Sequence, residues 1–254
     1  MNDNTKNELL RMALSAVVPL FLLGTMYLMK GLEIGMEWDF THLGVYPLSK
    51  RGAFGIFAHP LVHSSFRHLF ANTFPLLFLS WSLFYFYRGI ASTILIVIWI
   101  AEGILTFCIG QPGWHVGASG VIYGLAFFLF FSGLLRRYVP LIAISLLVTF
   151  LYGGMVWNMF PQFVKPTTSW EGHLSGAVVG TLCAFAFRKE GPQSINPFEG
   201  EEEAEGTEEE SSGEYFISEQ QAEAGEELQV HRSEQQQAGE EKEDLNGNER
   251  VGEC

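Results

Sequence analysis

Three short polar motifs interrupt the apolar sequence, and each lies at the start of a long apolar run. They are His68-Leu69-Phe70-Ala71-Asn72, Gly117-Ala118-Ser119-Gly120 and Gly172-His173-Leu174-Ser175-Gly176. A histidine or hydroxyl in hydrocarbon costs free energy, so polar residues within membrane helices usually have a function. Ser119 and His173 have the side chains that serve as nucleophile and base in covalent catalysis. The sequence therefore predicts a Ser–His dyad assembled from two membrane helices.

Ser119 stands between small residues at the predicted start of a helix. The N–H groups of a first helical turn have no intrahelical acceptor, and together with the helix dipole they suit a developing oxyanion. Gly117 and Gly120 leave room for another backbone to approach this segment. An ordinary helix crossing would also place small residues here, so packing alone is the competing interpretation of the motif.

His173 opens the last apolar run and shares its helical face with two glycines. Gly176 and Gly180 follow at offsets of three and seven residues, which put them on the His173 side of a helix. Such spacing lets a neighbouring helix pack closely. Glu171 is the acidic neighbour of His173, but its spacing points it elsewhere. The alternative is a structural histidine bonded to a backbone carbonyl.

Three further residues are predicted to support the dyad. His68 and Asn72 are four residues apart, so they share one helical face. With the N–H of Ser119 they would form an oxyanion hole, although such a pair could also simply tie two helices together. Tyr123 lies one turn after Ser119, where its ring would either stack on the imidazole or only fill space.

The other polar residues in or near the apolar runs are expected to be structural. Glu102 is the one carboxyl within a run, so it should be protonated or paired with a polar group of another helix. His63 is assigned a structural or gating role, and we expect hydrogen-bonded loop positions for His42, His59 and His115. The sequence has no HExxH motif and no CxxC or Cys/His zinc spacing, so neither a metal nor a cofactor is predicted.

Six stretches are long and apolar enough to cross a hydrocarbon core of about 30 Å, which takes about 20 residues. They lie near residues 12–29, 68–87, 91–110, 118–135, 139–158 and 170–187. With six spans, one side collects the basic residues Lys6, Arg11, Arg88, Arg136, Arg137, Arg188 and Lys189, and that side should be cytoplasmic. The fold class predicted is an all-α membrane protein, a six-transmembrane-helix bundle with a structured outer loop at about 30–67.

Residues 189–254 differ sharply in composition from the rest of the chain. They hold 21 of the 28 Asp and Glu residues but only 4 of the 15 Lys and Arg residues. Rich in Glu, Gln, Gly and Ser, this segment cannot bury a core and is predicted to be a disordered acidic cytoplasmic tail. Residues 1–11 are a predicted short cytoplasmic N-terminus, and residues 12–188 the membrane domain.

The net charge of −13 reflects this tail. No basic cluster indicates a nucleic-acid partner. The segment Tyr215-Phe216-Ile217 is either a chance cluster or a motif that binds an unknown partner of the tail. Cys108, Cys183 and Cys254 show no pairing pattern.

The three polar motifs, in this order, resemble the rhomboid family of intramembrane serine proteases over residues 12–188. The resemblance rests on His63…His68-x-x-x-Asn72, Gly117-Ala118-Ser119-Gly120-Val121-Ile122-Tyr123 and Gly172-His173-x-x-Gly176-x-x-x-Gly180. It implies that Ser119 is the nucleophile and His173 the base. It also implies oxyanion donation by His68, Asn72 and the Ser119 amide, with Gly117 and Tyr123 in support. The Trp-Arg pair often found in the family's first outer loop is missing, because Trp38 precedes Asp39.

The resemblance implies a serine endopeptidase that cleaves transmembrane proteins near the outer membrane face. We expect an integral multi-pass protein of the bacterial cytoplasmic (inner) membrane, with the lipid bilayer and transmembrane substrates as partners. Hydrolysis needs water, so a wet cavity is predicted, lined by His63, His68, Asn72, Gln111, Ser119 and His173 and gated by residues 160–166. The competing classes are a catalytically silent rhomboid-like binder and a transporter or channel, although no inverted repeat is visible.

Overall fold

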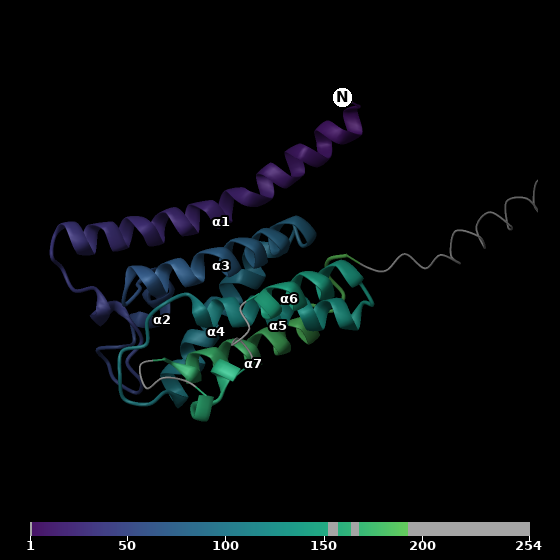
Figure 1. The fold of residues 1–254 in the computed structure, drawn as a ribbon. Coiled ribbons are helices and arrows are strands. Elements are labelled where there is room, and N and C mark those ends of the chain that lie inside the picture. The colour runs from purple at the N-terminus through teal and green to yellow at the C-terminus, as the bar shows by residue number, and fades with distance from the viewer. Residues whose placement is uncertain (1, 152–156, 164–167, 193–254) are drawn as a thin grey trace, which may run out of the picture. The chain divides into compact units, whose positions relative to one another are not determined.

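The computed structural model describes residues 2–151, 157–163 and 168–192, and these residues form a bundle of α-helices (Figure 1). The long helices are α1 (Asp3–Gly35), α3 (Phe66–Phe86), α4 (Ala91–Ile109), α5 (Ser119–Leu135), α6 (Val139–Leu151) and α7 (Trp170–Ala186). The short elements are α2 (Gly55–Ala58) and the 3₁₀ helices η1 (Thr41–Leu43), η2 (His59–Leu61), η3 (Trp157–Met159) and η4 (Pro161–Phe163). The described part of the chain is therefore all-helical, apart from one isolated β-bridge.

The helix boundaries differ from the predicted spans at two places. The first helix runs from Asp3 to Gly35, so it is longer than the predicted span 12–29 and includes most of the predicted N-terminal segment. The fifth predicted span, 139–158, begins as α6, but residues 152–156 lie outside the described residues and Trp157–Met159 is a 3₁₀ turn. The predicted acidic tail lies outside the described residues from position 193 onward.

The length and apolar character of the helices make this a multi-pass membrane protein. Asn4–Gly35, Phe66–Phe86 and Ala91–Ile109 are long and apolar enough to cross a bilayer, and Ser119–Leu135 and Val139–Phe150 are shorter apolar helices. A helix of 17 residues is about 26 Å long, slightly less than the hydrocarbon core of about 30 Å. The count of six crossings therefore stays a prediction.

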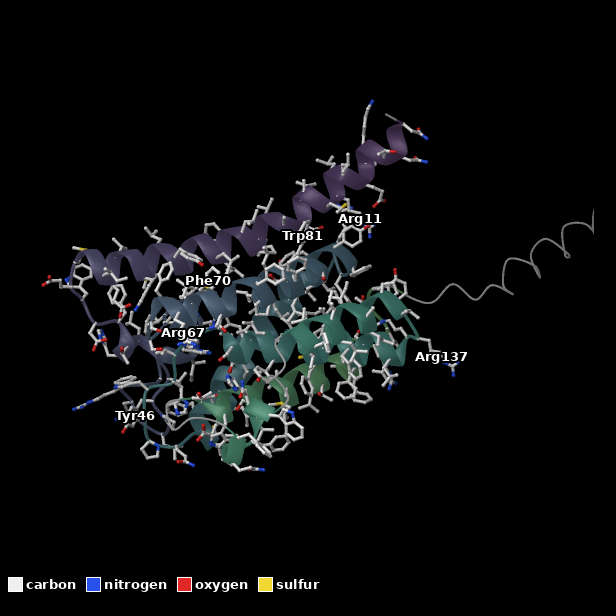
Figure 2. The ribbon with its side chains drawn as sticks, in the orientation of Figure 1. Arg11, Tyr46, Arg67, Phe70, Trp81 and Arg137 are labelled. Carbon is white, nitrogen blue, oxygen red and sulfur yellow. The ribbon has the colours of Figure 1, made fainter. Side chains whose placement is uncertain are left out.

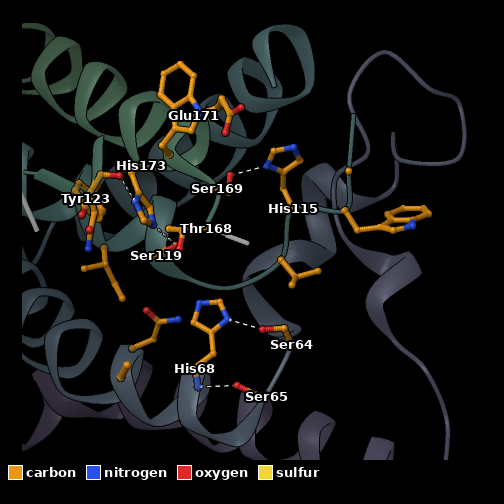
Figure 3. Close-up of a pocket in the computed structure, with 18 of the residues that line it drawn as sticks. Ser64, Ser65, His68, His115, Ser119, Tyr123, Thr168, Ser169, Glu171 and His173 are labelled. Carbon is orange, nitrogen blue, oxygen red and sulfur yellow. Dashed lines mark hydrogen bonds between the residues drawn. The ribbon is translucent and has the colours of Figure 1, made fainter. Parts of the chain in front are cut away.

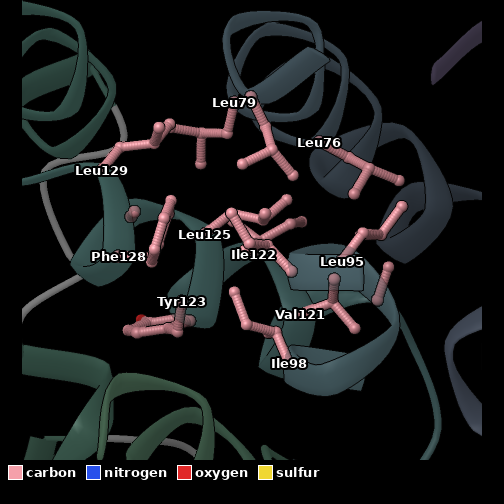
Figure 4. Packing of buried hydrophobic residues seen from close by; sticks show 14 of the residues in the cluster. Leu76, Leu79, Leu95, Ile98, Val121, Ile122, Tyr123, Leu125, Phe128 and Leu129 are labelled. Carbon is pink, nitrogen blue, oxygen red and sulfur yellow. The ribbon is translucent and has the colours of Figure 1, made fainter. Parts of the chain in front are cut away.

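Helix α5 lies at the centre of the bundle and is buried along most of its length. Its apolar side chains pack against those of α3 and α4 (Figure 4). The residues in contact there include Leu76, Leu79, Leu95, Ile98, Val121, Ile122, Leu125, Phe128 and Leu129. Because close-packed side chains resist displacement, this packing fixes the position of Ser119, the first residue of α5.

The most extensive helix contact joins α5 and α7, and glycines make it possible. A Cβ atom at Gly176 would overlap the carbonyl oxygen of Gly120, and one at Gly180 would overlap that of Gly124. Only glycine lets the two backbones come this close. The glycines that follow His173 in the sequence thus lie on the side of α7 that packs on α5. This contact brings the starts of the two helices together.

The long connection between α1 and α3 is structured and bound to the connection between α4 and α5. Val45 and His115 form an isolated antiparallel bridge, with N–H···O distances of 2.9 and 2.8 Å. The N–H of Leu48 also donates to the carbonyl of Phe107, at 3.1 Å. These bonds anchor the backbone that leads into Ser119.

Candidate active site

Ser119 and His173 meet at the starts of α5 and α7. The hydroxyl oxygen of Ser119 lies 3.0 Å from Nε2 of His173 (Figure 3). The other ring nitrogen, Nδ1, lies 2.8 Å from the backbone carbonyl oxygen of Asn158. A carbonyl only accepts hydrogen bonds, so Nδ1 must carry the proton. Nε2 is then left with a free lone pair facing the hydroxyl, which is the arrangement that a general base requires.

Among the described residues, an aromatic ring and not a carboxylate lies beside the base. The ring of Tyr123 stacks on His173 with centroids 4.4 Å apart and planes 11° apart. Glu171 is turned away, since its Oε1 accepts the N–H of Gln111 at 3.4 Å. The imidazole is therefore held in its plane by Tyr123 and in its tautomer by the Asn158 carbonyl.

His68 and Asn72 face the same cavity as Ser119 from helix α3. Ser65 caps this helix by accepting the N–H of His68 at 3.1 Å, and Ser64 bonds Nδ1 of the same ring at 3.2 Å (Figure 3). The amide nitrogen of Asn72 is buried and has no acceptor among the residues that the structure describes. It is thus available to a ligand in the cavity.

Gly117 allows the His68 ring to lie against the chain just before the nucleophile. Its φ is +111°, a conformation that residues with a Cβ rarely adopt. A Cβ here would also lie 2.5 Å from Cε1 of His68. Both the backbone conformation and the contact with His68 therefore require glycine at this position.

The cavity at the dyad has a volume of about 1100 Å³. Its walls include five of the six residues predicted to line a wet cavity, His68, Asn72, Gln111, Ser119 and His173. His63 is the exception. Of the predicted gate, Pro161 lies on the cavity wall, whereas residues 164–167 lie outside the described residues.

His63 lies behind the cavity and bonds the backbone that leads into Ser119. Its Nε2 accepts the N–H of Ala118 at 3.4 Å, which is a structural role. Burial, reinforced by the nearby charge of His68, lowers the pKa of His63 from its ordinary 6.5 to about 3. The ring therefore stays neutral near pH 7 and keeps the lone pair that accepts this bond.

Among the remaining histidines, His115 and His59 have the hydrogen bonds that were expected. His115 bonds the Ser169 hydroxyl through Nδ1 at 2.5 Å and the Gln111 carbonyl through Nε2 at 3.0 Å. His59 is also hydrogen-bonded, and it pairs with Glu102. The side chain of His42 is exposed, and for this residue the expectation stays a prediction.

Two contributors to the site were missed from the sequence. The Asn158 carbonyl that fixes the tautomer of His173 is a backbone group, and no side chain marks it. Lys30 lies at the end of the first apolar run, where its Nζ donates to the His63 carbonyl at 3.0 Å and pairs with Glu33 at 2.6 Å. The spacing of three residues between Lys30 and Glu33 was a usable signal for this pair.

Comparison with known proteins identifies the family. The model of the rhomboid domain matches residues 50–190, more than half of the chain and the whole of the site. The chain belongs to the rhomboid family. Within it, α3 to α7 and all the proposed site residues fall inside the matched range, whereas α1 precedes it.

Several relatives of this rhomboid are bacterial. An uncharacterized protein of Mycobacterium tuberculosis is 40% identical over 151 residues, which cover 56% of this chain and 62% of the relative. An uncharacterized protein of Mycobacterium leprae is 31% identical over 193 residues, which cover 72% of this chain and 75% of the relative. A mimivirus protein, named as a candidate rhomboid protein, is 28% identical over 130 residues, which cover 49% of this chain and 70% of the relative. The match thus spans less than two thirds of the M. tuberculosis protein's length.

Proposed function

We propose that this rhomboid is a serine endopeptidase that cleaves transmembrane proteins near the outer face of the membrane. The observation that carries the proposal is the contact of 3.0 Å between the Ser119 hydroxyl and Nε2 of His173. The Asn158 carbonyl holds the proton on Nδ1, so the hydroxyl faces a lone pair and not a second N–H. A histidine that served only to join helices would not need this tautomer.

The proposed reaction proceeds in two halves. Ser119 Oγ attacks the substrate carbonyl carbon while its proton passes to Nε2 of His173. The N–H of Ser119, His68 and the Asn72 amide donate to the oxyanion that forms. His173 then gives the proton to the leaving amine, and an acyl-enzyme remains on Ser119. A water molecule, deprotonated by His173, hydrolyses this ester and restores the hydroxyl.

The cavity supports this reaction because it gives water access to a dyad placed among apolar helices. The carbonyls of a helical substrate are held in hydrogen bonds, so the segment to be cleaved must first unwind. Gly or Pro near the cleavage site would lower that cost. The predicted gate at 160–166, of which 164–166 lie outside the described residues, would admit the substrate, since Pro161 within it and Asn158 just before it line the cavity.

The proposed topology has six crossings, with both chain ends in the cytoplasm. Basic residues at the predicted inner loops support it. Five apolar helices would supply five of the crossings, and α7 would supply the sixth. Residues 189–254 would then be an acidic cytoplasmic tail. The mycobacterial relatives support placement in a bacterial cytoplasmic membrane.

A fluorophosphonate probe on the detergent-solubilised protein tests the proposal. Such probes phosphonylate a serine that is activated by a base, so the wild type should be labelled and Ser119→Ala and His173→Ala should not. Ser175→Ala is the matched control, because Ser175 is a buried serine of α7 outside the cavity wall and its loss should leave labelling intact. Equal labelling of Ser119→Ala and wild type would contradict the assignment. A wild type that is not labelled but binds membrane proteins would point to the silent binder.

A further inference from the structure

A second buried polar pair, His59 and Glu102, lies beside the dyad and has no part in the reaction proposed above. Nε2 of His59 lies 2.7 Å from Oε1 of Glu102. Their exposed fractions are 4% and 1%. His59 belongs to η2 and Glu102 to α4, so the pair connects the α1–α3 connection to the interior of the bundle.

Hydrogen bonds hold the His59 ring through both of its nitrogens. Nδ1 of His59 lies 2.8 Å from the Gly55 carbonyl oxygen, which can only accept, so Nδ1 carries a hydrogen. Nε2 is then the ring nitrogen that bonds the Glu102 carboxyl group. A buried pair of this kind is stable only while both partners are present, because removal of one leaves the other without a hydrogen bond.

The pair contacts the nucleophile's segment on both sides of Ser119. Ahead of it, the backbone carbonyl of His59 accepts the N–H of Gly117 at 2.9 Å. After it, the Glu102 carboxyl lies against Gly120, so close that a Cβ there would be 2.6 Å from Oε2. Thr106, one turn along α4, donates its hydroxyl to the same oxygen at 3.5 Å.

We propose that the His59–Glu102 pair is a positioning element that holds residues 117–120 in register with His173 and the oxyanion donors. The inference rests on the proposed function, because it assigns the pair's effect to the Ser119 hydroxyl and N–H. Displacement of reacting groups by about 1 Å can cost about 100-fold in rate. Both residues act through the backbone at 117–120 and touch no substrate.

A different hydrogen bond offers a matched comparison. Trp99, also on α4, donates its indole N–H to the Phe57 carbonyl at 3.1 Å. Like the pair, this bond joins α4 to the α1–α3 connection, and no contact of Trp99 with residues 117–120 is found in the described structure. If the pair merely anchors this connection, Trp99→Phe and a Glu102 variant should have similar effects on activity.

The experiment compares Glu102→Gln, Glu102→Leu and Trp99→Phe in the full-length protein. Cleavage of a transmembrane substrate gives kcat and KM, fluorophosphonate labelling gives the reactivity of Ser119, and thermal unfolding reports stability. Glu102→Leu should lower kcat and the labelling rate by about 10- to 100-fold and leave KM within about twofold. Glu102→Gln can still bond Nε2 of His59 through its amide, so kcat should stay within about threefold of wild type. Trp99→Phe should leave kcat unchanged.

Two results would overturn the inference: a folded Glu102→Leu with wild-type kcat, or a Glu102→Gln as impaired as Glu102→Leu. If Glu102→Leu does not fold, the double variant His59→Phe/Glu102→Met replaces the pair by apolar side chains and leaves no unpaired group. It should fold and show the same loss of kcat. Wild-type kcat in the double variant, or failure to fold, would also overturn the inference.

The proposed function is tested separately by the wild type and Ser119→Ala. If cleavage does not depend on Ser119, the proposed function fails and the inference fails with it. If cleavage depends on Ser119 but the Glu102 variants all behave as wild type, only the role of the pair is wrong.

Discussion

The residues around Ser119 divide into those that bear on the reacting atoms and those that hold the backbone. Two α3 side chains, His68 and Asn72, line the cavity with Ser119. The buried Asn72 amide lacks an acceptor within the described residues, although buried donors are normally paired. A carboxamide left open toward a cavity is consistent with a donor reserved for an oxyanion. Figure 2 draws these side chains as sticks on the ribbon, together with the others whose placement is described.

Substitution of the proposed oxyanion donors should affect the transition state more than substrate binding. His68→Ala and Asn72→Ala should each lower kcat by about 10²- to 10³-fold, with KM little changed, because the oxyanion exists only after attack. Ser64→Ala removes only the hydroxyl that bonds Nδ1 of His68 and should cost less. Steady-state cleavage of a transmembrane substrate measures this. An increase in KM with unchanged kcat would show that these residues bind substrate and do not stabilise an oxyanion.

His63 should make the protein sensitive to acid. Its pKa is about 3 in the folded protein against an ordinary 6.5, so between these pH values the unfolded chain binds the extra proton. Stability from this residue is fully present above pH 6.5 and is lost as the pH falls toward 3. Unfolding temperatures of wild type and His63→Gln in detergent, measured from pH 7.5 to 4, should fall less steeply for the variant. Parallel curves would contradict the role of His63.

For the residues of the site, the sequence predicted which side chains come together but not which backbone groups contact them. Ser119, His173, His68, Asn72 and Tyr123 were found because their residue types are unusual at the starts of apolar runs, and the structure brings them to one cavity. Their catalytic roles stay predictions. The Asn158 carbonyl that orients the base could not be found, because any residue at that position would supply the same oxygen.

Among the helices, the contact between α5 and α7 decides whether the dyad forms. Gly120 and Gly124 on one helix meet Gly176 and Gly180 on the other. The nucleophile and the base lie in the first turns of these two helices and contact each other. Any change in the distance between the two helix axes is therefore transmitted to the contact between Ser119 and His173.

A methyl group at Gly180 should separate the two helices. The added Cβ would overlap the Gly124 carbonyl oxygen, and overpacking of this kind costs about 1–3 kcal/mol. Gly180→Ala should therefore lower both the unfolding temperature and the rate of fluorophosphonate labelling. Gly24→Ala is the matched control, since a Cβ in that part of α1 has no heavy atom within 4 Å. Equal stability of the two variants would contradict the close packing.

The sequence predicted which segments form helices but not where those helices begin and end. Hydropathy marks the part of a helix that suits lipid, so it predicted a first span of 12–29. The helix itself continues to Asp3 and Gly35, because polar residues such as Lys6 and Glu8 are compatible with a helix outside the hydrocarbon. For the same reason the predicted 139–158 span did not anticipate the 3₁₀ turn at Trp157–Met159.

Contacts of Arg136 show how far toward the C-terminus the chain is bound to the helix bundle. Arg136, at the end of α5, is buried and donates to the Phe187 carbonyl at 2.6 Å and to that of Glu190. The chain is thus tied to the bundle as far as Glu190. The acidic composition of the segment that follows cannot sustain a core of its own.

Removal of residues 195–254 should leave a folded and active protein. The deletion takes away no contact of Arg136, so the unfolding temperature and kcat should match those of the full-length chain. A deletion of 187–254 is the sharper comparison, because it removes the Phe187 and Glu190 carbonyls, two of the acceptors of the buried Arg136 guanidinium, and should destabilise the bundle. Loss of activity in the shorter deletion would show that the tail contributes to catalysis.

The hydrogen bond that sets the tautomer of His173 ends on the main chain of η3, and this bears on how the protein evolves. Mutation of codon 158 changes a side chain and leaves the orienting oxygen in place. The Asn158 side chain also hydrogen-bonds Tyr123, whose ring stacks on His173, so an exchanged residue keeps the orienting oxygen but loses this second contact unless its side chain can replace it. Codons 119 and 173 have no such freedom.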